Sequence, residues 1–93
     1  MFVGICTISL HLSDNRSLKG KRRVVKTIID RVKNRFNVSI AEVDHQDLWQ
    51  RIELGVAVVS NDKGHAHSNL TAVVNFIDGL HLAELFDFEI ELV

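Results

Sequence analysis

The sequence predicts an α+β sandwich with the element order strand, helix, strand, strand, helix, strand. Three observations lead to this prediction: apolar residues alternate in four segments, they recur at helical spacing in two others, and no proline interrupts the 93 residues. Two strand–helix–strand units with right-handed crossovers build a ferredoxin-like βαββαβ fold, a four-stranded antiparallel sheet with two helices on one face. A chain of this length makes one domain, which we place at residues 1–93.

The first half of the chain is expected to form a strand, a helix and a second strand. Residues 2–12 alternate between apolar and polar side chains, as in a strand with one buried face. Ser17 is a suitable N-cap for the helix that follows. Residues 37–43 form the second strand, although the order Ala41-Glu42-Val43 blurs its alternation. The apolar side of the helix carries Leu18, Val25, Ile28, Ile29, Val32 and Phe36.

The second half is expected to repeat this plan. Residues 52–58 alternate as a third strand, which a long loop joins to the second strand in a hairpin. Asp62 caps the second helix, and Gly79 ends it in the left-handed conformation that glycine tolerates. The last strand turns Phe86, Phe88, Ile90 and Leu92 toward the helices. The apolar side of the second helix carries Ala66, Leu70, Val73, Val74 and Ile77.

The sheet face without helices is predicted to be acidic and to lack aromatic rings. RNA-recognition motifs share this topology, but they stack bases on aromatic side chains of that face. We therefore do not expect the sheet to bind RNA in that way. The second and fourth strands are expected at the sheet edges. The side chains predicted on the open face are Thr7, Ser9, His11, Glu53, Asp87, Glu89 and Glu91.

A net charge of −1 conceals a strong separation of charge along the chain. Residues 16–35 hold nine cations and one acid, whereas residues 36–93 hold two cations and ten acids. A helical wheel gathers four of the cations into one stripe, and the capped start of the helix offers amide donors to an anion. We predict nucleic-acid contact here; a plain solvated helix face and self-association are the alternatives. The predicted contact residues are Arg16, Lys19, Arg22, Arg23, Lys26 and Lys33.

The loop between the second and third strands is a further candidate site. His45, Gln46, Asp47 and Trp49 offer acid–base groups, hydrogen bonds to base edges and a ring for stacking. We prefer a structural interpretation, in which Trp49 covers the end of the core while His45 and Asp47 close the turn. If the loop is functional, we expect binding rather than catalysis.

No metal, cofactor or catalytic group is predicted. His65 and His67 lie two positions apart on a helix and point about 200° away from each other, so they do not converge with the remaining histidines on one ion. Acylphosphatases share this topology and cradle phosphate in the loop after the first strand. Here that loop, residues 13–16, lacks glycine and contains Asp14, which would repel phosphate.

Composition places the chain among globular proteins of a reducing compartment. Hydrophobic residues make up 46% and charged residues 25% of the chain, which excludes a disordered protein and a membrane span. Cys6 is the single cysteine, so no internal disulfide forms. The first cation is Arg16, too late for the basic head of a signal peptide. We expect a cytoplasmic protein.

Three segments carry a resemblance to a known family. These segments are residues 16–24 (Arg-Ser-Leu-Lys-Gly-Lys-Arg-Arg-Val), residues 35–43 (Arg-Phe-Asn-Val-Ser-Ile-Ala-Glu-Val) and residues 45–51 (His-Gln-Asp-Leu-Trp-Gln-Arg). Together they resemble the YlxP-like family of small bacterial proteins. The resemblance implies a ferredoxin-like fold with unknown function and no catalytic residues to transfer. Because the family's genes often lie among those of translation factors, it also implies a bacterial cytoplasmic protein that acts near RNA or the ribosome.

Overall fold

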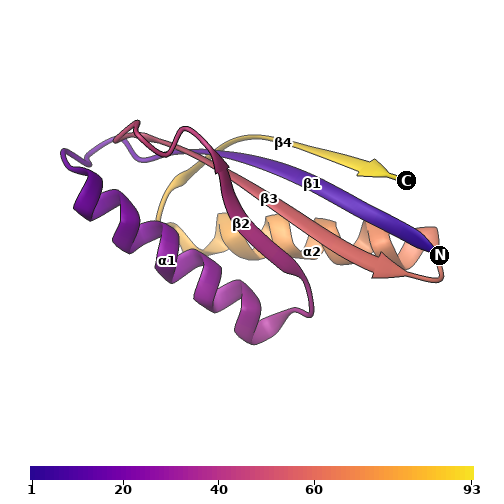
Figure 1. The fold of residues 1–93 in the computed structure, drawn as a ribbon. Coiled ribbons are helices and arrows are strands. Elements are labelled where there is room, and N and C mark those ends of the chain that lie inside the picture. Colours follow the sequence, from indigo (N-terminus) through magenta and orange to yellow (C-terminus); the bar gives the residue numbers. More distant parts are fainter.

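The computed structural model describes residues 1–93 and has the predicted order of elements. Its strands run antiparallel in the order β2-β3-β1-β4, which places β2 and β4 at the edges. Both helices lie on one face of this sheet (Figure 1), so the ferredoxin-like fold is confirmed. Neither helix combines the length and the apolar composition needed to cross a membrane. The elements are β1 (Phe2–His11), α1 (Leu18–Arg35), β2 (Ser39–Asp44), β3 (Arg51–Ser60), α2 (Lys63–Leu80) and β4 (Glu84–Leu92).

A core of 16 buried apolar residues fills the space between the sheet and the helices. Alternate positions of β1 and β3 supply much of it, and the apolar sides of both helices supply the rest, as the alternation predicts. Cys6 belongs to this core, where burial raises the pKa of its thiol to about 11. The thiol therefore stays protonated at neutral pH and acts as a small apolar side chain.

Both helices begin at the residues predicted from the sequence. The Ser17 hydroxyl accepts a hydrogen bond from the Gly20 N–H at 3.0 Å, and the Asp62 carboxylate accepts one from the His65 N–H at 3.0 Å. This bond holds the pKa of Asp62 below its usual value, because it favours the ionised carboxylate. Each side chain thus supplies an acceptor for an amide that has no partner inside its helix.

The end of α2 differs from the prediction. The helix continues through Gly79 to Leu80, and His81 instead takes the left-handed conformation, with φ of 53°. Because the helix extends to Leu80, this side chain packs against the core and buries apolar surface that an end at Gly79 would expose. Histidine is among the residues that adopt this conformation more readily than most.

Two irregularities in strand pairing change which side chains face the helices. In β4 the pairing moves from Ser9–Asp87 to Leu10–Leu85, so Phe86 is an extra residue opposite β1. This bulge turns Phe86 to the open face, where its side chain is 72% exposed. The prediction that this face lacks aromatic rings is therefore wrong.

The second irregularity lies in β2, where the sequence alternation is blurred. The pairing with β3 shifts between Glu42 and Asp44, so Val43 is the extra residue. Its side chain lies over Gly55, which leaves room because a side chain at Gly55 would collide with it. Glu42 pairs with the buried Leu54 and so faces the helices, which is an unusual direction for a carboxylate.

The sheet parity can be tested with two valines of β3. Val56 is 2% exposed and Val59 is 66% exposed. We expect Val56→Asp to lower the free energy of unfolding by several kcal/mol, because it buries an unpaired charge. Val59→Asp should change it by no more than about 0.5 kcal/mol. Urea unfolding monitored by circular dichroism measures both, and equal stability of the two variants would contradict the assigned faces.

Candidate nucleic-acid interface

All six predicted contact residues are exposed, on α1 and on the turn before it. Lys19, Arg22, Lys26 and Lys33 follow one side of the helix over a length of about 21 Å, at about 1.5 Å per residue. Lys26 lies 2.8 Å from Asp30, but both side chains are more than half exposed. Such surface pairs contribute only about 0.3 to 0.5 kcal/mol, so Lys26 remains available to another anion.

Lys21 is the exception among the nine cations of residues 16–35. It is 1% exposed, and its Nζ lies 3.0 Å from Glu42 Oε2 while it donates a hydrogen bond to the backbone carbonyl of His45. In the sequence Lys21 stands out only as part of a basic block. A signal was present, because on the wheel that starts at Leu18 it falls at about 300°, between the core residues of α1. Lys21 therefore positions α1 and does not belong to the cationic surface.

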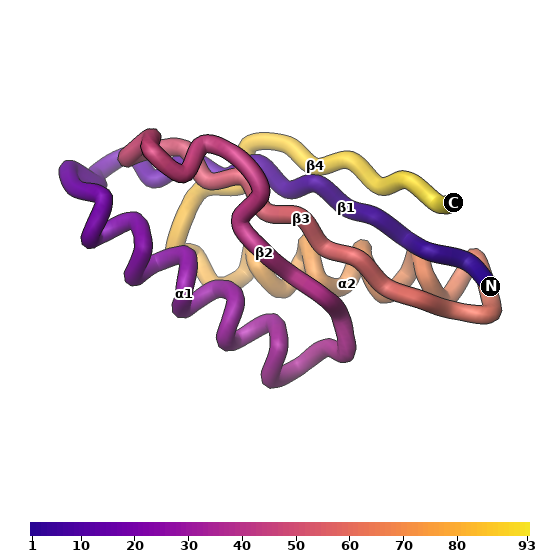
Figure 2. Tube along the Cα trace, viewed as in Figure 1, coloured from indigo at the N-terminus to yellow at the C-terminus, as the bar shows by residue number.

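The loop between β2 and β3 lies beside the turn between β1 and α1 (Figure 2), and side-chain hydrogen bonds join the two segments. The Asn15 side-chain amide donates to the carbonyls of Ser17, at 2.7 Å, and of Trp49, at 2.6 Å. The Gln50 side-chain amide donates to the carbonyls of Ser13 and Asn15, at 3.3 and 3.1 Å. Gly20 leaves room for Asn15, because a side chain there would collide with the Asn15 amide oxygen. The start of α1 and the loop are thus held together.

The loop itself matches its structural interpretation only in part. The carbonyl of His45 accepts from the Leu48 N–H at 3.0 Å, so His45 does close a turn, with φ of 58°. Trp49, however, is 52% exposed and does not cover the end of the core, which corrects that expectation. Backbone carbonyls, rather than the tryptophan ring, attach this loop to the domain. Gln46 and Asp47 are both exposed.

His65 and His67 lie apart from the histidine of the first strand. His65 and His67 are exposed in the first turns of α2, away from His11 on the sheet. The group of potential metal ligands that does converge is Asp44, His45 and Glu53, whose ligand atoms lie within 4.8 Å of one another. Glu53 in this group accepts a hydrogen bond from the Ser9 hydroxyl. Its carboxylate is therefore already engaged within the sheet.

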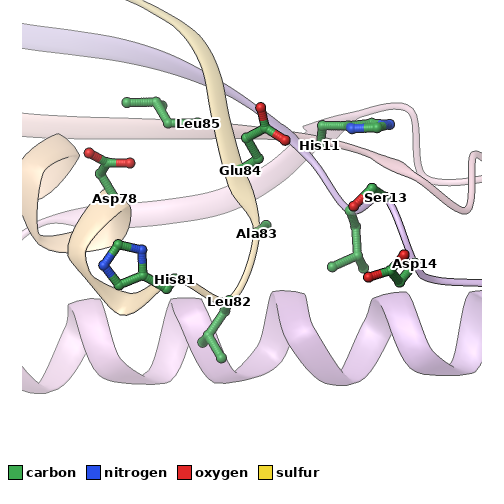
Figure 3. Close-up of a pocket in the computed structure, with 10 residues that line it drawn as sticks. His11, Ser13, Asp14, Asp78, His81, Leu82, Ala83, Glu84 and Leu85 are labelled. Carbon is green, nitrogen blue, oxygen red and sulfur yellow. The ribbon is translucent and has the colours of Figure 1, made fainter.

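The largest hollow, about 550 Å³, lies between the end of β1 and the connection from α2 to β4. Figure 3 shows Asp78 and His81 on one side of it and His11, Ser13 and Asp14 on the other. Its three carboxylates, on Asp14, Asp78 and Glu84, repel phosphate. The hollow is consequently acidic and does not extend the cationic surface of α1.

A smaller hollow of about 270 Å³ shares His11 and Glu84 with the first and adds Arg51 and Phe86. The Arg51 guanidinium carbon lies 5.7 Å from the centre of the Phe86 ring, within the range of a cation–π contact. Neither Arg51 nor Phe86 is among the site residues predicted from the sequence. The bulge conceals the direction of Phe86, and the sequence shows Arg51 only as a cation in the acidic part of the chain and as the last residue of the segment 45–51 that resembles the family.

These observations define an α+β plait of the ferredoxin-like class that presents a cationic helix on one side and an acidic sheet face on another. The chain belongs to the DUF503 family, proteins of unknown function, which it matches over residues 3–90. It is 43% identical over 76 residues to the uncharacterized protein YlxP of Bacillus subtilis (strain 168). The match covers 82% of this chain and 83% of that protein. The resemblance found in the sequence is therefore confirmed.

One solved structure supports the fold. The de novo designed protein Foldit4 superposes with a TM-score of 0.53 at 16% identity, over 99% of this chain and 94% of that one. A second designed protein with a ferredoxin fold, LFR1 1, has a TM-score of 0.48 at 16% identity, over 100% and 83% of the two chains. At such identities the likeness concerns the fold alone.

Lys21 and Lys19 make a matched pair for testing the buried contact. We expect Lys21→Met to lower the free energy of unfolding by about 3 kcal/mol, because Glu42 loses the cation that compensates its burial. Lys19→Met should leave it within about 0.5 kcal/mol of the parent. Adding Glu42→Leu to Lys21→Met should restore most of the loss, since an apolar pair tolerates burial. Urea titration measures all three variants. Equal melting of the two single variants would exclude a structural role for Lys21.

Proposed function

We propose that this protein is a non-catalytic RNA-binding module, suited to the structured RNA of the ribosome, that contacts phosphates through α1. The observation that carries the proposal is the exposure of eight of the nine cations of residues 16–35, with Asp30 as the sole acid among them. A solvated surface normally mixes both signs, which keeps a protein soluble without a field of one sign. A cationic surface of this kind attracts a polyanion.

The direction of the helix supports the same partner. The first turn of α1 contains no acid, so the positive end of the helix dipole adds to the charges of Arg16 and Lys19. Lysine and arginine side chains there reach phosphates without reading bases, and the stripe holds no asparagine or glutamine that would do so. We therefore expect contact with the backbone of RNA and little preference for sequence.

Enzymatic phosphate chemistry finds less support in the same region. The loop of residues 13–16 corresponds in place to the phosphate cradle of acylphosphatases. Here the Asn15 amide donates to two backbone carbonyls, of Ser17 and Trp49. That side chain holds the loop together, which favours a positioning role over a catalytic one.

A homodimer is the second candidate, since the acidic face of the sheet complements α1 in charge. The helices and the open face lie on opposite sides of the sheet (Figure 1). Contact between the helix layer of one copy and the open face of another joins two different surfaces, which leads to rings or filaments rather than a two-fold dimer. Light scattering at low and high salt detects such association, because salt screens exposed charges.

The proposal is tested by changing Lys19, Arg22, Lys26 and Lys33 together to Gln. We expect the logarithm of affinity of the parent for a structured ribosomal RNA fragment to fall against the logarithm of salt with a slope of about −3 or steeper, for four or more phosphate contacts. The variant should melt like the parent but lose about three units of that slope. Filter binding across a salt series gives the slopes.

Arg31→Gln serves as the matched control, because Arg31 is exposed on the same helix about 150° from the centre of the stripe. It should reduce affinity less than Lys26→Gln does. A fourfold variant that folds normally and still binds RNA as tightly as the parent at every salt concentration would exclude α1 as the contact. Self-association would then be the better account of the separated charge.

A further inference from the structure

Two exposed aromatic rings flank one arginine at the end of the sheet. Phe86 is 72% exposed beneath the Arg51 guanidinium, in the hollow that His11 and Glu84 complete. Arg51 also lines a shallow depression with Leu48, Trp49 and Gln50. Arg51 therefore borders both the hollow that contains Phe86, the most exposed phenylalanine, and the depression that contains Trp49, the only tryptophan of the chain.

The local backbone presents these side chains to solvent. Phe86 is the extra residue of the β4 bulge, and bulges often re-aim a side chain next to a functional site. Trp49 follows the turn at His45. Its backbone carbonyl accepts a hydrogen bond from Asn15, whereas its ring makes no hydrogen bond to the domain. Single exposed apolar residues are ordinary on protein surfaces. Two exposed aromatic rings beside one arginine are a less common arrangement.

We infer that the surface defined by Trp49, Arg51 and Phe86 is a stacking site for an unpaired RNA base. This inference rests on the proposed function, to which it adds a contact with bases. Unpaired bases stack on aromatic rings and on arginine planes, and each stacked base contributes about 1 to 3 kcal/mol. The hollow beside Phe86, about 270 Å³, is smaller than the roughly 300 to 1,000 Å³ of pockets for drug-sized ligands, so it suits a single ring system.

The charges around the hollow favour a base over a phosphate. The Glu84 carboxylate repels phosphate oxygens, whereas it accepts hydrogen bonds from the amino groups of bases. His11 adds a further polar ring on the same wall. The cation of Arg51 is turned toward the Phe86 ring and thereby offers a plane for stacking.

The stacking surface is attached to the start of the cationic helix. One side-chain amide, that of Asn15, bonds both the carbonyl of Ser17, the N-cap of α1, and the carbonyl of Trp49. Lys21 of α1 donates to the carbonyl of His45 at the other end of the loop. An RNA in which a helix meets a single strand would therefore reach both contacts by passing around this end of the sheet, from the phosphate contacts on α1 to the base contact on the open face.

The experiment compares a single-stranded oligoadenylate of about 12 nucleotides, the length of a few base-stacking sites, with a duplex RNA of the same number of phosphates. Because the chain has one tryptophan and no tyrosine, its fluorescence reports on Trp49 alone. We expect the single strand to quench this fluorescence to saturation and the duplex to leave it nearly unchanged. Phe86→Ala should weaken single-strand binding about tenfold, the effect of losing one stacked base.

Phe88→Ala is the matched control. Phe88 is partly exposed on the same strand, but it pairs with the buried Ile8 and so lies on the helix side of the sheet. This variant should bind both RNAs like the parent. Arg51→Gln should weaken single-strand binding, as Phe86→Ala does, while binding of the duplex changes little.

The outcomes separate this inference from the proposed function. Parent-like binding of both RNAs by Phe86→Ala, with unchanged Trp49 emission, overturns the stacking site and leaves phosphate contact by α1 in place. If Phe86→Ala loses single-strand binding while the fourfold Gln variant keeps it, the stacking site is supported and phosphate contact by α1 is overturned. Absence of any RNA binding overturns both. A dimer that Phe86→Ala dissociates without affecting RNA binding identifies the surface as a contact between copies and overturns the inference.

Discussion

The buried ion pair between Lys21 and Glu42 determines how the first half of the domain is assembled. Each charge lies on the side of its element that faces the core, where an unpaired ion carries a large desolvation penalty. Lys21 donates a hydrogen bond to the carbonyl of His45, whereas the buried Oε2 of Glu42 has no hydrogen-bond partner and depends on the ion pair with Lys21 alone. Such a pair adds little net stability over an apolar one, but it penalises every arrangement that separates its members.

This constraint extends to the cationic stripe of α1 and to the loop between β2 and β3. If α1 rotated by one residue on the sheet, Lys21 would leave Glu42, and a different side of the helix would meet the solvent. The hydrogen bond from Lys21 to His45 fixes one end of the loop, while Asn15 fixes the other end. The position of the cationic stripe and that of Trp49 therefore depend on the same buried contact.

Regular elements could be predicted from the sequence because their periodicity follows directly from burial. The alternation in β1 and β3 and the spacing in both helices reflect one covered face each, and Ser17 and Asp62 are cap residues by chemistry. The bulges could not be predicted, since an inserted residue changes the facing of its neighbours without a distinct composition. Phe86 was assigned to the wrong face for this reason. The buried position of Lys21 could be predicted only from its place on the helical wheel, because its charge alone indicates an exposed side chain.

Separation of charge gives the molecule a property that its net charge of −1 does not suggest. Exposed cations gather on α1, whereas Asp87, Glu89 and Glu91 follow one another along the edge strand β4 on the far side of the sheet. A body with such opposite poles has a large electric dipole moment. It experiences a torque in the field of a polyanion, so it rotates during approach and arrives with α1 leading, even though the molecule as a whole is nearly neutral. Orientation before contact, rather than overall attraction, is then the contribution of its long-range electrostatics.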